Sequence, residues 1–146
     1  MAFTYEYPRM MVTVDAIVFL TDSSNNIQKI LLIKRKNNPY KDLYALPGGF
    51  PEMDELLVDA AKRELLEETG LTNINLRQFH AFDAPDRDPR GRNVSVAFVG
   101  ITTEENSSLQ AGDDAGEADW FPIDKIPPLA FDHKEVVELA LNRLKK

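Results

Sequence analysis

The order of apolar and polar positions predicts strands along much of the chain. Residues 11–20 and 28–35 (MVTVDAIVFL and QKILLIKR) are rich in β-branched residues, and the turn-forming TDSSNN between them predicts a hairpin. Further strands are predicted at residues 43–46, 74–82, 94–101 and 119–121. These strands do not alternate regularly with helices, so the pattern argues against a doubly wound parallel sheet.

Two segments show the periodicity of amphipathic helices. Apolar positions three and four apart predict a central helix over residues 54–69, which Gly70 would end as a C-terminal cap. Residues 132–144 predict a second helix. Mixed strands with two helices predict an α+β fold, built as an α/β/α sandwich, with the whole chain of residues 1–146 forming a single domain.

Two polar segments are predicted to be loops. Residues 47–55 (PGGFPEMDE) are rich in proline and glycine, and we expect no regular structure there. Residues 103–119 (TEENSSLQAGDDAGEAD) are polar throughout. Loops longer than about 12–15 residues are uncommon in compact domains and are usually functional or disordered.

Composition narrows the classes of function and of site. The net charge of −7 argues against nucleic acid or an anionic membrane as a partner. The absence of cysteine excludes disulfides and thiolate metal sites, so any metal site must consist mostly of oxygen ligands, which favours Mg²⁺, Mn²⁺ or Ca²⁺. No apolar run approaches the ~20 residues of a membrane span, and the N-terminus does not resemble a signal peptide. We therefore expect a cytoplasmic protein.

An acidic stripe continues the apolar face of the central predicted helix. This face is formed by Leu57, Ala60, Ala61, Glu64, Glu67 and Glu68. Like charges three and four apart repel, and the helix dipole disfavours acid at this end. A hard divalent cation would offset both costs, and the flexible backbone at Gly48 and Gly49 would let a carbonyl join its ligands. The alternatives are a solvated acidic helix end and an ordinary turn at the glycines.

The stretch GFPEMDELLVDAAKRELLEETGL, residues 49–71, matches the Nudix box G-x5-E-x7-R-E-U-x-E-E-x-G-U, in which U is a bulky aliphatic residue. The specified positions are filled by Gly49, Glu55, Arg63, Glu64, Leu65, Glu67, Glu68, Gly70 and Leu71. The chain therefore resembles Nudix hydrolases. That family has an α/β/α sandwich fold and hydrolyses nucleoside diphosphates linked to another moiety.

The resemblance implies a chemistry and a set of roles. Water would attack a phosphorus with the assistance of Mg²⁺ or Mn²⁺. Glu64, Glu67 and Glu68 would bind the metal, helped by the carbonyl of Gly48 or Gly49. Glu55 and Arg63 would have supporting roles, because a guanidinium can hold a carboxylate of the box in place by a forked ion pair.

Segments outside the box resemble the ADP-ribose pyrophosphatase subgroup. Pro85 lies 15 residues beyond Gly70, and DAPDRDPRGRNVSVAFVG, AGDDAGEADWFP and LAFDHKEVVELAL are similar to that subgroup. This resemblance implies a small-molecule nucleotide substrate, ADP-ribose, cleaved to AMP and ribose 5-phosphate. The alternatives are a nucleoside triphosphate, a dinucleotide or a nucleotide sugar as substrate, or a non-catalytic ADP-ribose-binding sensor.

Several side chains are candidates for holding the substrate. Arg87, Arg90 and Arg92 form a basic cluster, and guanidinium forks suit pyrophosphate oxygens, although ordinary solvated charge is the alternative. Aromatic candidates for stacking on adenine, each with a core position as the alternative, are Tyr44, Phe82 and Phe131.

A general base is expected from the long acidic loop. Asp114 or Glu117, close to Asp113, could orient or deprotonate water once the loop closes, although a merely solubilising loop is the alternative. His80 and His133 are weaker candidates. The N-terminal residues 3–14 (FTYEYPRMMVTV) carry aromatic and apolar side chains that would either cross to a partner in a homodimer or cover their own core.

Overall fold

The computed structural model describes residues 2–110 and 115–144 and contains a mixed sheet between two helices. Its strands are β1 (Met11–Thr21), β2 (Ile27–Arg35), β3 (Tyr44–Ala45), β4 (Gly48–Gly49), β5 (Arg77–Phe82), β6 (Asn93–Thr102) and β7 (Ala115–Pro122). Its helices are α1 (Leu57–Thr69) and α2 (His133–Leu144), with short 3-10 turns at Glu104–Asn106 and Ile123–Lys125. Neither α1 nor α2, the long helices of the described residues, has the length and apolar character needed to cross a membrane.

Strand β1 lies near the middle of the sheet. The main order is β3-β2-β1-β6-β5, and β4 pairs with β1 while β7 pairs with β2. β1 and β6 run parallel from the Met11–Asn93 pair to the Leu20–Thr102 pair, whereas β1 and β2 form the predicted antiparallel hairpin. From Thr13 onward every residue of β1 is buried, which explains why this strand is an almost continuous apolar run in the sequence.

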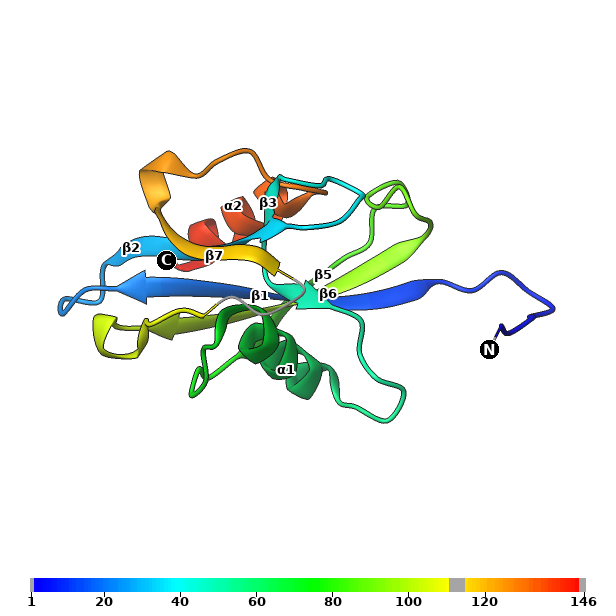
Figure 1. Cartoon of the computed structure of the whole chain (residues 1–146), viewed down its shortest axis with the longest axis horizontal. Coiled ribbons are helices and arrows are strands. Elements are labelled where there is room, and N and C mark those ends of the chain that lie inside the picture. The colour runs from blue at the N-terminus through cyan, green and yellow to red at the C-terminus, as the bar shows by residue number, and fades with distance from the viewer. Residues whose placement is uncertain (1, 111–114, 145–146) are drawn as a thin grey trace.

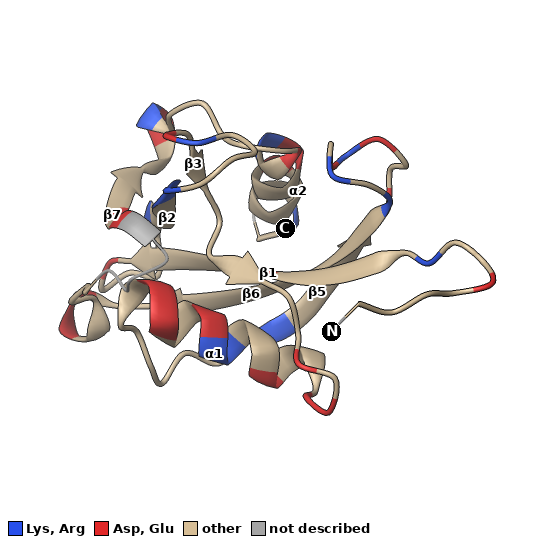
Figure 2. Cartoon of the chain, turned by 45° about the vertical axis from the view of Figure 1, so that its right-hand side comes forward, with Lys and Arg blue, Asp and Glu red and all other residues tan. Residues whose placement is uncertain are grey.

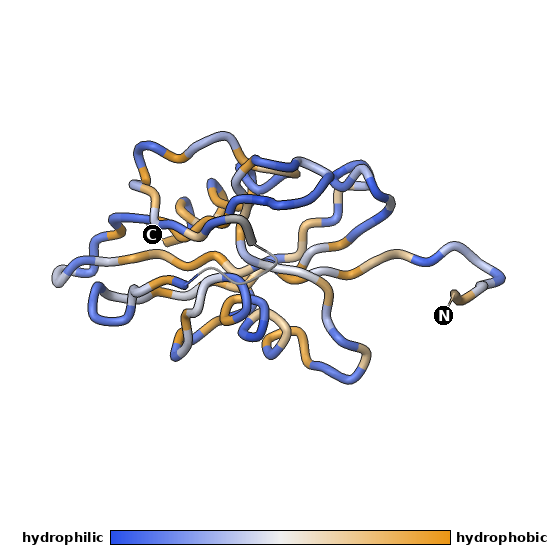
Figure 3. The backbone as a smooth tube through the Cα atoms, viewed as in Figure 1, coloured by the Kyte–Doolittle hydropathy of each residue, from blue (hydrophilic) through white to orange (hydrophobic). Residues whose placement is uncertain are grey.

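The two helices cover opposite faces of the sheet, with α1 below it and α2 above it in the view of Figure 1. Alternation along β1 sends Val14, Ala16 and Val18 into the core with α1, while Ile17 and Phe19 join the core with α2. The apolar colour in Figure 3 is correspondingly concentrated on the inner strands. The predicted α/β/α sandwich is confirmed.

The face of the sheet toward α2 becomes polar at the beginnings of β1 and β6. Thr13 and Asp15 of β1, and Asn93 and Ser95 of β6, are buried. Thr13 is paired in register with Ser95, so these side chains come from adjacent strands. Burying these four polar side chains, here called the polar strip, stabilises the fold less than burying apolar side chains would. The polar strip is therefore a candidate for a functional role.

The prediction of no regular structure in residues 47–55 is wrong at its glycines. Gly48 and Gly49 form β4, in register with Asp15 and Val14 of β1. A Cβ atom on Gly48 would lie only 2.2 Å from the Val14 carbonyl oxygen, so this close pairing requires glycine.

Other element boundaries also differ from the predictions. Helix α1 begins at Leu57 rather than at residue 54, because the backbone before it forms a separate turn in which the Glu55 amide donates to the Glu52 carbonyl. The Glu55 carboxylate accepts hydrogen bonds from the Glu52 amide in this turn and from Arg63 in the helix. Gly70 ends the helix as predicted, with a left-handed φ of 79°. The strand predicted at residues 119–121 is present but longer: β7 begins at Ala115, in the predicted loop, because its backbone pairs along β2 from Lys29 to Arg35.

Residues 2–10 extend away from the body of the protein in Figure 1. They are exposed, and the exposed fractions of Phe3 and Tyr7 reach 71% and 73%. The covering of the chain's own core by this segment is therefore not observed, while the homodimer remains a prediction.

Candidate active site

A cavity of about 350 Å³ lies beside the polar strip of β1 and β6. It is lined by Thr13, Asp15, Ile33, Arg35, Lys36, Asn37, Leu46, Gly48, Gly49, Phe50, Glu64, Glu68, Arg87, Asp88, Arg90, Asn93, Phe131 and His133. The lining therefore combines acidic residues of α1 with arginines from β2 and from the loop before β6. Figure 2 shows acidic bands along α1 and a basic band at the end of β2.

Arg63 connects the acidic residues of α1 to the preceding loop. Its Nε and Nη2 donate to the Glu55 carboxylate at 2.8 and 3.0 Å, and its Nη1 donates to Glu64 at 3.0 Å. The same Nη1 lies 3.3 Å from Glu67 Oε2. Hydrogen bonds from Arg63 lower the pKa of Glu55 and reciprocally raise the pKa of Arg63. The structure thus brings together Arg63 and three of the carboxylates predicted to work with it.

The partly buried Glu64 and the buried Glu68 form a carboxyl pair. Glu68 is only 6% exposed and accepts a hydrogen bond of 2.9 Å from the Gly48 amide. Burial, opposed by that amide and reinforced by the charge of Glu64, raises the pKa of Glu68 to about 9. Burial also raises the pKa of Glu64. Two such groups resist ionising together, so the pair is costly to the protein on its own.

The glycines hold the backbone against this pair. A Cβ atom on Gly49 would lie 2.7 Å from the Glu64 carboxylate, so any other residue would push the two segments apart. The resulting close approach places β4 against the carboxyl oxygens of Glu64, and carboxyl oxygens suit a hard divalent cation.

Glu67, the third predicted metal ligand, does not lie with Glu64 and Glu68. The Glu67 side chain is 51% exposed and is turned toward Arg63. Within residues 2–110 and 115–144, no group of three or more acidic, histidine or cysteine side chains is arranged to hold an ion. Glu64 and Glu68 therefore fit a cation as a pair, and Glu67 would join them only after leaving Arg63.

Two of the predicted arginines line the opposite wall, each with its own carboxylate. The Arg87 side chain is 3% exposed and donates to both oxygens of Asp132, at 2.9 and 2.6 Å. Arg90 donates from Nε and Nη2 to the carboxylate of Asp88, at 3.1 and 2.8 Å. Burial opposes ionisation of Asp88, but the bonds from Arg90 outweigh it and lower the pKa of that carboxyl.

Arg35, which the sequence reasoning missed, completes this wall. Its guanidinium lies 5.0 Å from the centre of the Phe131 ring, and that of Arg90 lies 5.5 Å from the same ring. Burial, together with the like charge of Arg90, lowers the pKa of Arg35. Strand alternation was the available signal, because it places Arg35 on the same face as the buried Ile33.

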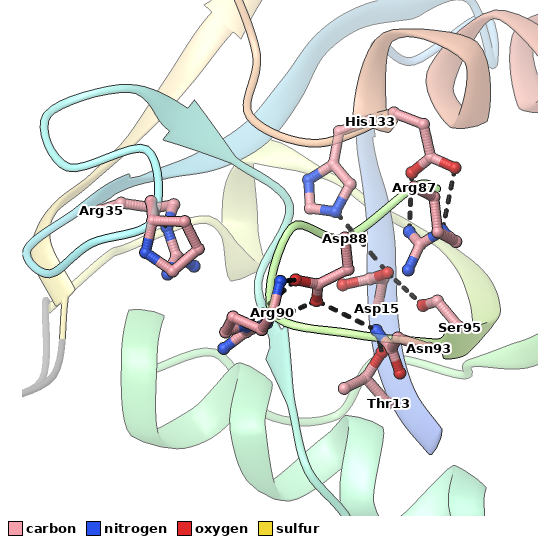
Figure 4. Close-up of polar contacts among 11 residues, drawn as sticks. Thr13, Asp15, Arg35, Arg87, Asp88, Arg90, Asn93, Ser95 and His133 are labelled. Carbon is pink, nitrogen blue, oxygen red and sulfur yellow. Dashed lines mark hydrogen bonds and ion pairs between the residues drawn. The ribbon is translucent and has the colours of Figure 1, made fainter. Parts of the chain in front are cut away.

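His133 is a structural part of the cavity wall. Its Nδ1 accepts a hydrogen bond of 3.0 Å from the Leu46 amide, and its Nε2 lies 3.7 Å from Asp15 Oδ2 (Figure 4). Asp15 also accepts a hydrogen bond from the Ser95 hydroxyl. Burial lowers the pKa of His133, which favours the neutral ring. This network ties the beginning of α2 to β1 and to the residues just before β4.

Other residues predicted to touch the substrate lie outside the cavity lining. Arg92 donates to the Asp83 carbonyl at 2.7 Å, and Pro85 is exposed. Glu117 is exposed and accepts a hydrogen bond of 3.3 Å from the Tyr44 hydroxyl. Asp113 and Asp114 lie outside the described residues. The roles predicted for these residues stay predictions.

The aromatic and histidine candidates are divided in the same way. Phe131 lines the cavity, whereas Tyr44 and Phe82 pack against the core beneath α2. His80 lies beside Arg143, with 3.3 Å between His80 Nδ1 and Arg143 Nη2. Phe131 is therefore the aromatic candidate that the fold brings to the site.

Comparison with known proteins decides the family. A model of the NUDIX domain matches residues 11–140. The chain belongs to the Nudix family. It is 48% identical over 110 residues to an ADP-ribose pyrophosphatase of Methanocaldococcus jannaschii, covering 75% of this chain and 64% of that protein. It is also 35% identical over 143 residues to an ADPR responsive transcriptional repressor of Acinetobacter baylyi, covering 95% of this chain and 56% of the repressor. The chain thus spans less than two thirds of either relative.

Solved structures of Nudix proteins have the same fold. The NUDIX domain of Shewanella oneidensis NrtR in complex with ADP ribose has a TM-score of 0.86 and 31% identity, covering 94% of this chain and 90% of that one. A Francisella tularensis bifunctional NMN adenylyltransferase/ADP ribose pyrophosphatase with AMP and a manganese ion has a TM-score of 0.81 and 34% identity, covering 95% of this chain and 43% of that one. Members of this family are typically metal-dependent, and manganese is present in this relative.

Proposed function

We propose that this Nudix protein hydrolyses ADP-ribose to AMP and ribose 5-phosphate with the aid of Mg²⁺ or Mn²⁺. The observation that carries the proposal is one cavity lined both by the Glu64–Glu68 carboxyl pair and by arginine side chains. Carboxylates suit a hard cation and guanidinium groups suit phosphate oxygens, so the cavity matches a diphosphate that arrives with a metal. The similarity to the Methanocaldococcus jannaschii ADP-ribose pyrophosphatase supports ADP-ribose as that diphosphate.

The acidic wall of the cavity, formed by Glu64 and Glu68, would hold the cation. Glu64 and Glu68 would bind it through carboxylate oxygens, with a carbonyl of Gly48 or Gly49 beside them and with Glu67 released from Arg63. When bound, the cation would polarise phosphate oxygens and lower the pKa of a water molecule. Arg63 would keep Glu64 oriented through the 3.0 Å bond that it already makes, while Glu55 would hold Arg63.

The basic wall of the cavity, formed by Arg35, Arg87 and Arg90, would hold the pyrophosphate. Arg35 and Arg90 both line the cavity and present guanidinium groups near Phe131. Their mutual repulsion would be relieved by an anion between or beside them. Arg87 would brace this wall through Asp132, and Arg92 and Pro85 would contribute from the same loop. Asp114 and Glu117 remain our candidates for the general base.

The test is a substrate panel with product identification. We expect the purified protein to release AMP and ribose 5-phosphate from ADP-ribose when Mg²⁺ or Mn²⁺ is present, and to stop when the metal is chelated. The panel should rank ADP-ribose by kcat/KM against a nucleoside triphosphate, a dinucleotide and a nucleotide sugar. Absence of turnover with both metals, or a higher rank for another substrate, would reject ADP-ribose hydrolysis as the main activity.

A second candidate function is ADP-ribose sensing without hydrolysis. It is favoured by the similarity to the Acinetobacter baylyi ADPR responsive repressor, which covers 95% of this chain. In that case calorimetry would detect saturable ADP-ribose binding, while the same protein would release no AMP with either metal. Steady turnover would exclude this alternative.

A further inference from the structure

Asp15 of β1 presents one unpaired carboxyl oxygen to the cavity. The residue is only 7% exposed and lines the cavity together with Gly48 and Glu68. Its Oδ2 accepts a hydrogen bond from the Ser95 hydroxyl (Figure 4), whereas no donor in the described part of the chain reaches its Oδ1. Among these residues the unpaired side-chain atom that is closed to solvent belongs to Asn93, so Asp15 Oδ1 is accessible from the cavity.

Gly48 leaves this oxygen its room. Asp15 and Gly48 are register partners of the antiparallel pair β1 and β4. A Cβ atom on Gly48 would lie only 2.5 Å from Asp15 Oδ1, so a side chain at this position would cover the oxygen. The Gly48 amide also donates to the Glu68 carboxyl at 2.9 Å. Two carboxyl groups, one from β1 and one from α1, therefore meet at the same glycine.

The contacts of Asp15 within the protein are with neutral groups. His133 Nε2 lies 3.7 Å from Asp15 Oδ2. The Leu46 amide donates to Nδ1 of the same ring, which places the ring proton on Nε2, and burial lowers the pKa of His133 and favours the neutral ring. Arg87 and Arg90 form their ion pairs with other carboxylates. Ser95 and His133 thus hold Oδ2 in place without supplying a positive charge.

The surroundings of Oδ1 favour a divalent cation as its missing partner. An anionic phosphate would be repelled by the carboxyl groups of Asp15 and Glu68. A sugar hydroxyl can donate a hydrogen bond, but it is neutral and does not reduce the repulsion between these two groups. A hard cation reduces that repulsion, and Mg²⁺ usually keeps several water molecules that can donate hydrogen bonds.

The position of Asp15 suits the water shell of the cation better than a direct bond to it. No group of three acidic side chains within residues 2–110 and 115–144 is arranged around one point as ligands of an ion. A water molecule can bridge two polar groups almost as well as a direct hydrogen bond. Asp15 can therefore act on a cation that Glu64 and Glu68 bind, without being their third ligand.

We propose that Asp15 helps to bind the hydrated Mg²⁺ or Mn²⁺ by accepting, at Oδ1, a hydrogen bond from one of its water molecules. The inference rests on the proposed function for the presence of a cation in this cavity. It adds to the cation site a residue of β1 that lies outside the Nudix box of residues 49–71.

The first test measures Mn²⁺ binding to the metal-free protein, without substrate, by electron paramagnetic resonance of the free ion. Asp15→Asn keeps the size of the side chain and an acceptor for Ser95, but removes the carboxyl group. We expect the Kd for Mn²⁺ to rise about 10- to 100-fold, as is typical when a partner outside the direct ligands is lost. The control Asp124→Asn makes the same exchange at an exposed position and should bind Mn²⁺ within about twofold of the wild type.

A Kd for Mn²⁺ in Asp15→Asn within about twofold of the wild-type value would overturn the inference. Calorimetry with ADP-ribose in the absence of metal then separates cation binding from a structural role. We expect Asp15→Asn to bind ADP-ribose at least as tightly as the wild type, because a carboxyl group near an anionic ligand has been neutralised. Weaker binding of both Mn²⁺ and ADP-ribose would overturn the inference and make Asp15 a structural residue.

Weaker binding of ADP-ribose with unchanged binding of Mn²⁺ would also overturn the inference, and would assign Oδ1 to a hydroxyl of the ligand. Asp15→Ser removes the same carboxyl group with a smaller side chain that can still accept from Ser95. It provides the same comparison if Asp15→Asn does not fold.

The same measurements separate this inference from the proposed function. Loss of Mn²⁺ affinity in Asp15→Asn, when the wild type releases no AMP from ADP-ribose, would reject hydrolysis while supporting the role of Asp15. Hydrolysis by the wild type, with unchanged Mn²⁺ affinity in Asp15→Asn, would do the reverse. Absence of saturable Mn²⁺ binding by the wild type would overturn the inference, because Asp15 would have no cation to hold.

Discussion

The two walls of the cavity differ in how completely the protein satisfies its own charges. On the acidic wall, Glu64 is partly buried and Glu68 is buried, and burial raises the pKa of each carboxyl. On the basic wall, Arg87 and Arg90 each have a carboxylate partner, Asp132 and Asp88. The acidic wall therefore costs free energy until a cation binds, whereas most of the basic wall is stable without a ligand. Substitutions in the acidic wall should therefore raise the unfolding free energy while lowering activity, whereas substitutions in the basic wall should lower both.

Glu68→Gln, in the acidic wall, should have the largest effect, with a loss of activity and a gain of stability. The amide keeps an acceptor for the Gly48 N–H but removes a buried ionisable group and a predicted metal ligand. We expect kcat/KM for ADP-ribose to fall at least about 100-fold, the upper end of the loss typical of outer-shell partners of a metal. At neutral pH we expect the metal-free protein to gain about 1–2 kcal/mol of unfolding free energy, because glutamine is neutral in both states and avoids the cost of taking up a proton on folding.

Urea denaturation and steady-state kinetics on the same preparation measure both effects of Glu68→Gln. A suitable control is Glu138→Gln, which makes the same exchange at an exposed position of α2. A fully active Glu68→Gln variant would remove Glu68 from the site. A strongly destabilised variant would contradict the conclusion that the Glu64–Glu68 pair costs free energy in the metal-free protein.

Arg87→Met tests the opposite wall. Its guanidinium is almost fully buried and pairs with both oxygens of Asp132. Removing one partner of a buried ion pair costs about 3–5 kcal/mol, so we expect a loss of unfolding free energy near the lower end of that range, because Asp132 is partly exposed. Arg90→Met should lose about 1–3 kcal/mol, less than Arg87→Met, because it leaves the buried Asp88 without a guanidinium partner but with the hydrogen bond from the backbone amide of residue 90.

Chemical denaturation of the two arginine variants, with the double variant Arg87→Met/Asp132→Leu, measures this difference. Removing Asp132 as well should recover part of the lost stability, because no unpaired charge is then left behind. Equal losses for Arg87→Met and Arg90→Met would show that the burial of the Arg87 guanidinium does not distinguish the two pairs.

The pH dependence of stability provides a test that needs no mutation. The pKa of Glu68 is raised from 4.5 to about 9 in the folded protein, so the folded state holds a proton that the unfolded state releases. Its contribution to stability is complete below pH 4.5 and is lost as the pH rises toward 9. Each unit of pKa difference corresponds to about 1.4 kcal/mol.

We therefore expect the Tm of the metal-free protein to fall between pH 6 and pH 9, a window taken from the raised pKa of Glu68. Saturating Mg²⁺ or Mn²⁺ should reduce this slope, because the cation stabilises the ionised carboxylates. The lowered pKa values of Glu55 and Asp88 act in the acidic range, below this window. A Tm that rises through the window without metal would contradict the assignment.

The same contrast explains how far the sequence alone could predict the site. The acidic wall is local, because Gly49 and the glutamates of α1 lie within one 23-residue motif, residues 49–71, and helical spacing places Glu64 beside Glu68. The sandwich fold also follows from strand and helix periodicity. The missed strand β4 depends on pairing with the distant β1, which glycine content does not predict.

The basic wall is non-local, and this limited its prediction. Arg87 and Arg90 were identified as a cluster, but the carboxylate partner of Arg87 is Asp132, 45 residues away. Arg35 was missed because only the folded sheet brings β2 beside the loop that carries Arg90.

Substituting Arg35 should have the smallest of the expected effects, and it tests how Arg35 differs from Arg87 and Arg90 within the basic wall. Its Nε donates to the Pro39 carbonyl at 2.7 Å, and the carboxylates near it act on its pKa through charge. Arg87 and Arg90, by contrast, use their guanidinium groups to bind carboxylates directly. If Arg35 meets the pyrophosphate, Arg35→Ala should raise KM for ADP-ribose about tenfold, since one charge-assisted hydrogen bond contributes about 1.5–3 kcal/mol.

Arg35→Lys and Arg77→Ala distinguish recognition from general charge. Lysine keeps the positive charge but not the planar fork, so Arg35→Lys should recover only part of the lost affinity. Arg77 is exposed on β5, away from the cavity lining, and its removal should leave KM within about twofold of the wild-type value, as for most surface substitutions. Equal effects of Arg35→Ala and Arg77→Ala would mean that net charge, and no contact at Arg35, governs the affinity for the anionic substrate.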